Sequence, residues 1–332
     1  MLEKPNIADE LIMSRLQEEY GIHIEGLNFH PSGDFNNAAY SCIADDETKY
    51  FLKLRKGFEE INVTVPLFLR SQGIENIIVP YQTKSKHYWA DFGDYEIILY
   101  PFIEGKNGFE IELSDHHKRN LGMALKAIHS TQVPSSLKRH IPKETFSAQW
   151  RERVKSFLGQ ADKISFQDPV AAKLAKYIKS RQNEIYHLVE RAERLASELQ
   201  AESLELVSCH SDIHGRNILI TENDKLYIVD WDNPILAPKE RDLMFIGGGI
   251  DNIWTSKRDE AVFYEGYGKT ELDLFALAYY RFERVIQDVA DYGTQLLLRD
   301  NGPDRERVYE YFVTNFEPGT RLKIAEQTGK FN

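Results

Sequence analysis

The sequence has very little cysteine and no long hydrophobic run. Cys42 and Cys209 are the two cysteines among 332 residues, and they lie far apart in segments expected to be strands. Two separated cysteines support neither a disulfide framework nor a zinc site, and they fit a reducing compartment. No apolar run approaches the length that spans a bilayer, and the first residues lack the apolar core of a signal peptide. These absences predict a cytoplasmic protein without a membrane partner.

Positively charged residues are fewer than negatively charged ones. Lys and Arg number 41 against 52 Asp and Glu, which gives a formal net charge of −11. Nucleic-acid binders usually concentrate Lys and Arg in a stripe or patch, and no such cluster stands out, so no nucleic-acid partner is expected. An acidic chain attracts cationic small molecules, but acidity that serves solubility alone is the simpler explanation. Charge therefore leaves the substrate open.

The remaining composition is typical of a globular protein. Hydrophobic residues make up 42% and charged residues 28% of the chain, which excludes a largely disordered sequence. A chain of 332 residues can bury one large core, and it fits two lobes more comfortably. No linker is long enough to separate independent domains.

The first hundred residues are expected to be mostly sheet and the rest mostly helix. Residues 9–20 have helical spacing of apolar side chains and end at Gly21, and the polar turn at residues 45–48 joins two strand-like runs. Ser114 can cap a helix that opens the helical part. Strands are expected at residues 38–43, 50–54, 77–81, 88–91, 96–100, 204–207, 218–220 and 226–229, and a second early helix at residues 59–70.

Function concentrates in one loop, where residues 210–217 read His-Ser-Asp-Ile-His-Gly-Arg-Asn. Asp212 can accept or orient the proton of an attacking hydroxyl, and Asn217 offers a neutral oxygen to a metal ion. Asp230 ends the second strand of a hairpin that turns at residues 223–224, which returns it beside Asn217. Mg²⁺ prefers such oxygen ligands together with phosphate oxygens. The pattern predicts phosphoryl transfer with Asp212 as the catalytic residue.

Phosphoryl transfer also needs a cation near the phosphates, and Lys53 is the candidate. It lies in the apolar strand at residues 50–54, although an ordinary exposed strand lysine fits equally well. Glu59 or Glu60 on the next helix can hold this lysine, but acidic residues also favour helix starts because of the helix dipole. Whether that ion pair forms stays open.

The motif at residues 210–217, followed by Ile-Val-Asp-Trp-Asp at residues 228–232, strongly resembles the signature of aminoglycoside phosphotransferases and related small-molecule kinases. The similarity extends to Phe-Leu-Lys-Leu at residues 51–54, to the segment at residues 99–103 and to Glu-Arg-Asp-Leu at residues 240–243. The resemblance implies an α+β, bilobal, protein-kinase-like fold. It places an antiparallel-sheet, nucleotide-binding lobe at residues 1–102 and a larger, mostly helical lobe for catalysis and substrate binding at residues 103–332.

The same resemblance implies roles for individual residues. Asp212 is the catalytic aspartate, Asn217 and Asp230 bind Mg²⁺, and Lys53 contacts the phosphates of ATP or GTP. The segment that joins the two lobes is implied to bind the nucleotide, mainly through backbone groups that read the adenine edge. Its residues are Tyr100, Pro101, Phe102 and Ile103.

The acceptor is expected to be a small molecule that carries a hydroxyl group. Asp251, Trp254, Glu283 and Asp288 combine carboxylates with an aromatic face, which suits an alkylammonium ligand, although a solvated helix face is equally compatible. The resemblance favours an aminocyclitol or aminoglycoside antibiotic such as spectinomycin. A metabolite such as choline, homoserine or methylthioribose is the alternative.

Two other functions compete with the kinase hypothesis. Residues 211–215 also look like the first motif of metallophosphoesterases, but the further metal-binding motifs that those enzymes need are not found downstream. A non-catalytic nucleotide-binding scaffold would usually lack one of the catalytic groups. His210 and His214 are expected to hydrogen-bond the backbone or the neighbouring aspartate, and Asp242 is expected to anchor the loop from Pro234. Asp232, where protein kinases carry glycine, either supports metal geometry or caps the following loop.

Overall fold

The computed structural model describes residues 4–31, 37–161, 167–247, 256–297, 305–317 and 321–329. The α+β class is confirmed, with an antiparallel sheet near the N-terminus and helices in most of the remainder. The chain forms two compact units, and both are discontinuous in sequence. The first comprises Met1–Ile111, Pro134–His140 and Arg216–Pro234, and the second comprises Glu112–Val133, Ile141–Gly215 and Ile235–Asn332. The division at residues 102 and 103 stays a prediction.

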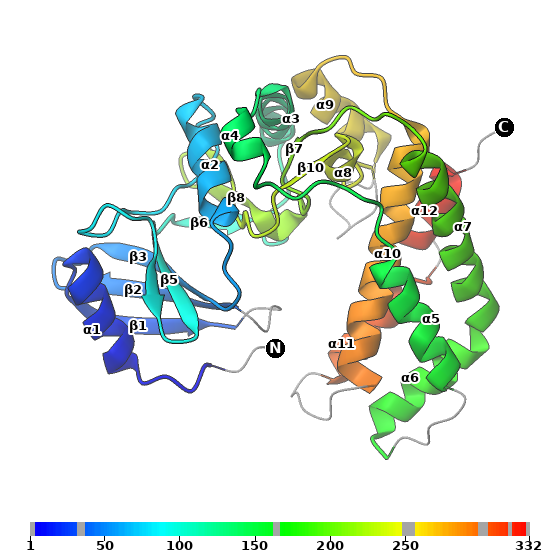
Figure 1. The fold of residues 1–332 in the computed structure, drawn as a ribbon, viewed down its shortest axis with the longest axis horizontal. Coiled ribbons are helices and arrows are strands. Elements are labelled where there is room, and N and C mark those ends of the chain that lie inside the picture. The colour runs from blue at the N-terminus through cyan, green and yellow to red at the C-terminus, as the bar shows by residue number, and fades with distance from the viewer. Residues whose placement is uncertain are drawn as a thin grey trace. The chain divides into compact units, whose positions relative to one another are not determined.

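The first unit contains a five-stranded antiparallel sheet with strand order β1-β2-β3-β5-β4 (Figure 1). The expected hairpin is confirmed, because β2 and β3 pair across the turn at residues 45–48. The strands are β1 (Ile24–His30), β2 (Asn37–Ala44), β3 (Lys49–Arg55), β4 (Ala90–Phe92) and β5 (Tyr95–Pro101). Strand β1 has no counterpart among the strands expected from the sequence.

One face of this sheet is apolar and packs against α1 (Asp9–Tyr20). Leu52 and Leu54 of β3 are fully buried in this core together with Ile12 and Leu16 of the helix. Burial of such a side chain contributes roughly 2 kcal/mol. Because successive side chains of a strand alternate between faces, Lys53 lies on the other face, as predicted. The alternation that builds the core therefore also places the lysine.

The prediction of a strand at residues 77–81 is wrong. Ile77 forms an isolated bridge with Ile228, and the Tyr81 N–H donates to the Leu99 carbonyl at 2.7 Å. Pro80 interrupts the run and has no N–H to donate to a ladder. The helix expected nearby is confirmed as α2 (Ile61–Ser71).

A second, three-stranded sheet in the first unit carries the hairpin predicted to hold Asp230. It has the order β6-β8-β9, with β6 (Gly105–Asn107), β8 (Ile218–Thr221) and β9 (Leu226–Ile228). The hairpin turns where predicted, because the Asp224 N–H donates to the Thr221 carbonyl at 3.0 Å and Asp224 has a φ of 63°. The strand β6, which pairs with β8, was not expected from the sequence. The first unit also contains the short helix α4 (Ser135–Lys138) and the turn η1 (Gly215–Asn217), which begins at the boundary.

The second unit is built around the long helix α10 (Leu274–Leu297), which runs beside several other helices (Figure 1). These neighbours are α5 (Gln149–Ala161), α6 (Pro169–Ser180), α7 (Gln182–Gln200), α8 (Glu240–Leu243), α11 (Arg305–Thr314) and α12 (Arg321–Thr328). Strands β7 (Val207–Cys209) and β10 (Ile235–Ala237) pair with each other. Together these elements position the loop that follows β7.

Helices α3 (Asp115–Ser130) and α9 (Lys257–Tyr267) form a close pair in the second unit. The predicted cap is confirmed, because the Ser114 side chain accepts from the His117 N–H at 3.2 Å. Gly122 and Gly266 allow the close approach, since a Cβ at either position would overlap backbone atoms of the other helix. The pair brings His129 at the end of α3 beside Tyr267 at the end of α9.

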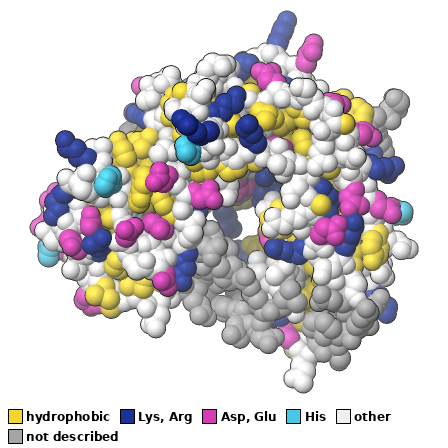
Figure 2. Space-filling view, viewed as in Figure 1, with side chains coloured by type: hydrophobic (Ala, Val, Ile, Leu, Met, Phe, Trp, Pro, Cys, Tyr) yellow, Lys and Arg dark blue, Asp and Glu magenta, His cyan; other side chains and the backbone are white. Residues whose placement is uncertain are grey.

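Acidic and basic side chains are interspersed over the visible face of the molecule (Figure 2). Within the described ranges, no helix combines the length and the apolar character needed to cross a membrane. Cys42 and Cys209 are both buried and are not joined in a disulfide.

Candidate active site

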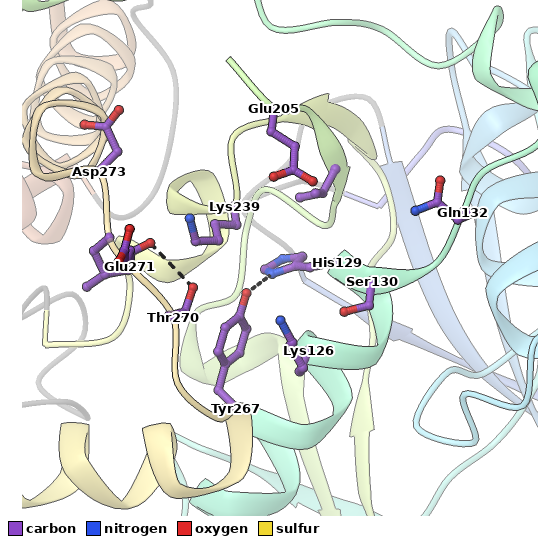
Figure 3. A pocket seen from close by; sticks show the side chains of 12 residues that line it. Lys126, His129, Ser130, Gln132, Glu205, Lys239, Tyr267, Thr270, Glu271 and Asp273 are labelled. Atoms are coloured by element: carbon purple, nitrogen blue, oxygen red, sulfur yellow. Dashed lines mark hydrogen bonds between the residues drawn. The ribbon is translucent and has the colours of Figure 1, made fainter. Parts of the chain in front are cut away.

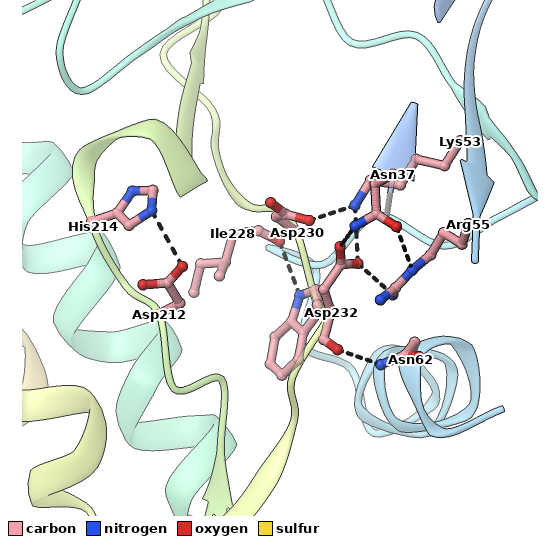
Figure 4. A network of polar contacts seen from close by, with 10 residues as sticks. Asn37, Lys53, Arg55, Asn62, Asp212, His214, Ile228, Asp230 and Asp232 are labelled. Carbon is pink, nitrogen blue, oxygen red and sulfur yellow. Dashed lines mark hydrogen bonds and ion pairs between the residues drawn. The ribbon is translucent and has the colours of Figure 1, made fainter. Parts of the chain in front are cut away.

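Asp212 lies in the loop after β7, and charged or polar side chains flank both of its oxygens. Arg284 Nη1 lies 2.7 Å from Asp212 Oδ1. On the other side, His214 Nε2 lies 3.3 Å from Asp212 Oδ2 (Figure 4). Burial raises the pKa of Asp212, but the Arg284 guanidinium and the His214 hydrogen bond outweigh burial and hold the pKa well below its ordinary value. The carboxylate is therefore ionised at neutral pH and fixed in orientation.

The backbone before Asp212 is anchored by Asp242, which is fully buried on α8. Its carboxylate accepts hydrogen bonds from the N–H of His210 at 3.0 Å and of Ser211 at 2.6 Å. Sequence reasoning assigned Asp242 to the loop from Pro234, so the anchored segment differs from the expected one. The reason is that α8 packs beneath the loop after β7, a long-range contact that the local sequence does not encode.

His129 completes this anchor from the other side. Its Nε2 lies 3.0 Å from Asp242 Oδ2, and its Nδ1 lies 2.8 Å from the Tyr267 hydroxyl. Burial raises the pKa of Asp242, but the hydrogen bond and charge of His129 and the His210 N–H hold the pKa below its usual range. The expected structural roles of the loop histidines are confirmed, because His210 Nδ1 accepts from the Asp212 N–H at 3.2 Å and His214 lies beside Asp212.

A polar cavity of about 780 Å³ opens over the His129–Tyr267 pair (Figure 3). Its lining mixes basic side chains, including Lys126 and Lys239, with acidic ones, including Glu205. Asp212 is not among the lining residues. The cavity therefore borders the anchor of the loop rather than the aspartate itself.

The predicted metal ligands Asn217 and Asp230 belong to the first unit, at the two ends of the β8–β9 hairpin. The Val229 N–H donates to the Asn217 carbonyl at 3.0 Å, which fixes the backbone next to Asp230 against that of Asn217. Asp230 has a φ of 68°, a left-handed conformation that is costly for a residue with a side chain. The donor set of one carboxamide and one carboxylate oxygen fits Mg²⁺.

Lys53 lies between two carboxylates rather than in solvent. Its Nζ pairs with Asp230 Oδ1 and lies 3.0 Å from Asp232 Oδ1 (Figure 4). Burial lowers the pKa of Lys53, but the two aspartates outweigh burial and raise the pKa above its ordinary value. Glu59 and Glu60 are exposed, and among the described residues the ion pairs of Lys53 are those with the two aspartates. Lys53 is therefore not the ordinary exposed strand lysine that the sequence also allowed.

Asp232 braces the sheet of the first unit. Arg55 Nη1 lies 2.8 Å from Asp232 Oδ1, and the Asn37 amide donates to Asp232 Oδ2 at 3.0 Å. The Asn62 side chain of α2 donates to the Asp232 carbonyl (Figure 4). Burial raises the pKa of Asp232, and Lys53 and Arg55 oppose that rise. This aspartate thus joins β3, α2 and the end of the hairpin.

The four connector residues predicted to bind nucleotide lie at and just after the end of β5. Tyr100 and Pro101 pair with Phe51 and Tyr50 of β3, and burial raises the pKa of Tyr100 to about 12. Phe102 and Ile103 follow and are half-buried. They are therefore adjacent in sequence to the strand that pairs with the lysine-bearing strand.

Two of the four predicted acceptor residues are described, and both have arginine partners. Glu283 is buried 2.6 Å from Arg151, and burial raises its pKa to about 7 against the effect of that arginine. Asp288 is buried between Arg284, at 3.3 Å, and Arg321. Asp251 and Trp254 lie outside the described residues.

Three residues of these networks were missed by the sequence reasoning. Arg284, Arg55 and His129 each reach residues that are far away in the chain. One local signal was present for Arg284, because Asp288 follows it at i+4 on a helix, a spacing typical of ion pairs. The partners of Arg55 and His129 depend on tertiary packing.

Protein-kinase-like phosphotransferases use a loop aspartate, a sheet lysine and a second aspartate as their catalytic groups, and these residue types are all present here. The chain belongs to the phosphotransferase enzyme family, whose model matches residues 31–286. It is therefore a phosphotransferase, and the metallophosphoesterase hypothesis is set aside.

Two solved structures of spectinomycin phosphotransferase APH(9)-Ia are similar over nearly the whole chain. The complex with ADP and spectinomycin is 37% identical, has a TM-score of 0.91, and the match covers 99% of this chain and 100% of that one. The AMP complex is 37% identical, has a TM-score of 0.86, and the match covers 97% and 99% of the two chains.

An aminoglycoside phosphotransferase from Alicyclobacillus acidocaldarius is similar in fold alone. It is 14% identical with a TM-score of 0.64, and the match covers 99% of this chain and 98% of that one. No curated protein sequence matches the chain. The similarity to these solved phosphotransferase structures confirms the bilobal, protein-kinase-like fold implied by the sequence motifs.

Proposed function

We propose that this phosphotransferase moves the γ-phosphoryl group of ATP, or of GTP, to a hydroxyl group of a small cationic molecule. The first candidate acceptor is an aminocyclitol antibiotic such as spectinomycin. The observation that carries this choice is the 37% identity, over 99% of the chain, to a phosphotransferase whose structure contains ADP and spectinomycin. Phosphorylation would make the drug less cationic, so the proposed outcome in a cell is antibiotic resistance.

In this proposal Asp212 accepts or orients the proton of the acceptor hydroxyl. A carboxylate has about four lone-pair sites, so Asp212 can accept from the acceptor hydroxyl while it holds its contacts with Arg284 and His214. Positioned proton transfer of this kind contributes roughly 10²- to 10⁴-fold to a rate. An ionised and oriented carboxylate is the state that this role requires.

Asn217 and Asp230 would hold Mg²⁺, which neutralises charge on the phosphate oxygens when it is bound. Lys53 supplies a further cation on the sheet, and its pairing with Asp230 keeps it charged and in place. The backbone of Tyr100, Pro101, Phe102 and Ile103 would contact the base of the nucleotide. The cytoplasmic location expected from the sequence suits this role, because ATP is abundant there.

Acceptor binding is assigned to acidic and aromatic side chains of the helical part. Asp251, Trp254, Glu283 and Asp288 stay the proposed residues, and an alkylammonium group is the chemistry that they would recognise. The arginine partners of Glu283 and Asp288 limit what these two can offer. A choline, homoserine or methylthioribose kinase is the alternative if no antibiotic is turned over.

The test is ADP or GDP release by the purified protein, with Mg-ATP or Mg-GTP and one acceptor at a time. The panel contains spectinomycin, other aminoglycosides, choline, homoserine and methylthioribose. The Asp212→Asn variant sets the background, because it removes the proposed base at a partly exposed position. Spectinomycin-dependent turnover that is lost in this variant would support the proposal.

Resistance can be measured in the same pair of proteins. Cells that produce the wild type are expected to tolerate more spectinomycin than cells that produce equal amounts of Asp212→Asn. Turnover of choline, homoserine or methylthioribose alone would keep the kinase and replace the acceptor. Absence of turnover with every panel member would contradict the proposed acceptor classes.

A further inference from the structure

A continuous chain of ion pairs reaches Asp212 from the C-terminal helix of the second unit. Arg321 of α12 pairs with Asp288 Oδ2, and Asp288 Oδ1 lies 3.3 Å from Arg284 Nε. Arg284 Nη1 lies 2.7 Å from Asp212 Oδ1. Two cations and two anions therefore alternate, and the chain ends at the carboxylate proposed as the base.

Contacts other than the one with Asp212 also hold the Arg284 side chain in place. Its side chain is 17% exposed, and its guanidinium lies 5.6 Å from the centre of the Phe245 ring. The carboxylate of Asp288 is 8% exposed, so its two arginines satisfy a charge that would otherwise be costly to bury. A planar guanidinium holds its donors in a rigid fork and bridges two carboxylates in one fixed geometry, whereas the donors of a lysine ammonium rotate.

We propose that Arg284 is a positioning residue for Asp212, and that Asp288 and Arg321 act through it. This inference rests on the proposed function, in which Asp212 receives the acceptor hydroxyl. Arg284 on one carboxylate oxygen and His214 on the other set which lone pairs face the hydroxyl. Misplacement of a reacting group by about 1 Å can cost on the order of 10² in rate, so the orientation has kinetic value.

In this proposal Asp288 holds Arg284 in place and does not bind the acceptor. Both of its oxygens are engaged by arginines, and the residue is 7% exposed. A carboxylate that binds the acceptor would mainly affect KM for the acceptor, whereas one that acts through Arg284 would mainly affect kcat. The two roles of Asp288 can therefore be separated by kinetics.

The first experiment compares Arg284→Gln, Arg284→Lys and Asp288→Asn with the wild type on any acceptor that is turned over. Arg284→Gln is expected to lower kcat about 10- to 100-fold, with KM for nucleotide and acceptor changed less than about threefold. Arg284→Lys should recover part of the loss, and Asp288→Asn should show a smaller fall in kcat. Arg153→Gln is the matched control, because Arg153 of α5 forms a largely exposed pair with Asp291 of α10, the helix that carries Arg284.

A pH profile supplies a readout that a merely structural role would not move. The charged and titratable groups that contact Asp212 include, among the described residues, Arg284 on α10 and His210 and His214 in its own loop. Without Arg284 the burial of Asp212 is less opposed, so the acidic limb of kcat is expected to shift to higher pH. The shift should be absent in Arg153→Gln and small in Arg284→Lys.

A ¹³C-carboxyl NMR titration of aspartate-labelled protein tests the same contact without turnover. The Asp212 signal is identified by its loss in Asp212→Asn, and its midpoint is expected to rise in Arg284→Gln. Absence of turnover in the wild type would count against the proposed function alone. The titration would still show whether Arg284 contacts Asp212 and lowers its pKa. A kcat of Arg284→Gln within twofold of the wild type, a rise in acceptor KM alone, or an unchanged Asp212 midpoint would overturn the positioning role.

Discussion

Asp242 accepts a 2.6 Å hydrogen bond from the backbone N–H of Ser211, a residue held at a φ of 74°. A left-handed backbone conformation costs a residue with a side chain roughly 1 kcal/mol or more, so it persists only when its surroundings enforce it. The buried carboxylate of Asp242 provides that enforcement from α8. One side chain outside the loop thus sets the backbone direction immediately before Asp212.

Asp242→Asn is expected to destabilise the protein by about 3 kcal/mol and to lower kcat. The amide keeps one acceptor, but its NH₂ then faces either the Ser211 N–H or the His210 N–H together with His129, which leaves a buried donor without an acceptor. Urea unfolding at neutral pH measures the loss. Asp94→Asn, an exposed position in the first unit, should change the free energy of unfolding by less than about 0.5 kcal/mol. An equal effect of the two substitutions would rule out the anchor.

Lys53→Met is expected to raise KM for the nucleotide at least about 10-fold and to destabilise the first unit. The substitution removes the cation between Asp230 and Asp232, and Asp232 then keeps Arg55 as its charged partner. Breaking a pair that is partly shielded from water leaves an uncompensated charge. Steady-state kinetics and thermal unfolding check the two effects.

The exposed Lys225 of the β8–β9 turn gives the control for that experiment. Lys225→Met should leave the nucleotide KM within about twofold of the wild type, because a solvated lysine contributes little. If Lys53→Met behaves in the same way, Lys53 has no phosphate-binding role.

The raised pKa of Glu283 predicts that the free energy of unfolding depends on pH. Its folded pKa of about 7 lies above the ordinary value of 4.5, so the folded state holds a proton that the unfolded state has lost between these values. Stability should therefore fall as pH rises from about 4.5 to 7, by on the order of 3 kcal/mol in all. Glu283→Gln should remove this part of the dependence.

Urea unfolding at pH 5, 6, 7 and 8 measures the Glu283 effect as a difference between wild type and variant. Glu306→Gln, at an exposed pair with Lys173, serves as the control and should parallel the wild type at every pH. Parallel curves for Glu283→Gln and the wild type would show that Arg151 keeps Glu283 ionised throughout this range.

Gly266→Ala is expected to destabilise the second unit by about 1 to 3 kcal/mol or more. The added methyl group would meet the backbone carbonyl of Arg119, and the α3–α9 pair would have to separate. Gly159→Ala in α5 is the matched control, since a Cβ there meets nothing within 4 Å. That substitution should be neutral or stabilise the helix by roughly 0.5 to 1 kcal/mol. Equal melting temperatures for the two variants would contradict the close packing.

The part of the site that was predictable from the sequence is the part that local structure builds. The spacing of Asp212 and Asn217 and the hairpin turn at Asp224 depend on short-range geometry, and the strand alternation of β3 turns Lys53 away from the buried leucines. The chemical roles proposed for these residues followed from the same motifs. Those roles stay predictions until turnover is measured.

The residues that were missed lie on long-range contacts. Arg284 approaches Asp212 across 72 positions, and His129 approaches Asp242 across 113 positions. Nothing in the neighbouring sequence encodes such a partner. The strand expected at residues 77–81 failed for a local reason, because Pro80 cannot join a ladder. The strand β6 is too short to give a recognisable alternation.

Strand β6 also has a consequence for synthesis of the chain. Gly105 pairs with Thr221, and the partner strand β8 leaves the ribosome only after helices α3 to α7. Strand pairing between such distant segments is slow, and an unpaired strand edge invites association with other chains. The five-stranded sheet can form early in translation, whereas the segment that carries Asn217 and Asp230 can join it only later. A nascent chain stalled before residue 218 should therefore expose β6 and depend on chaperones.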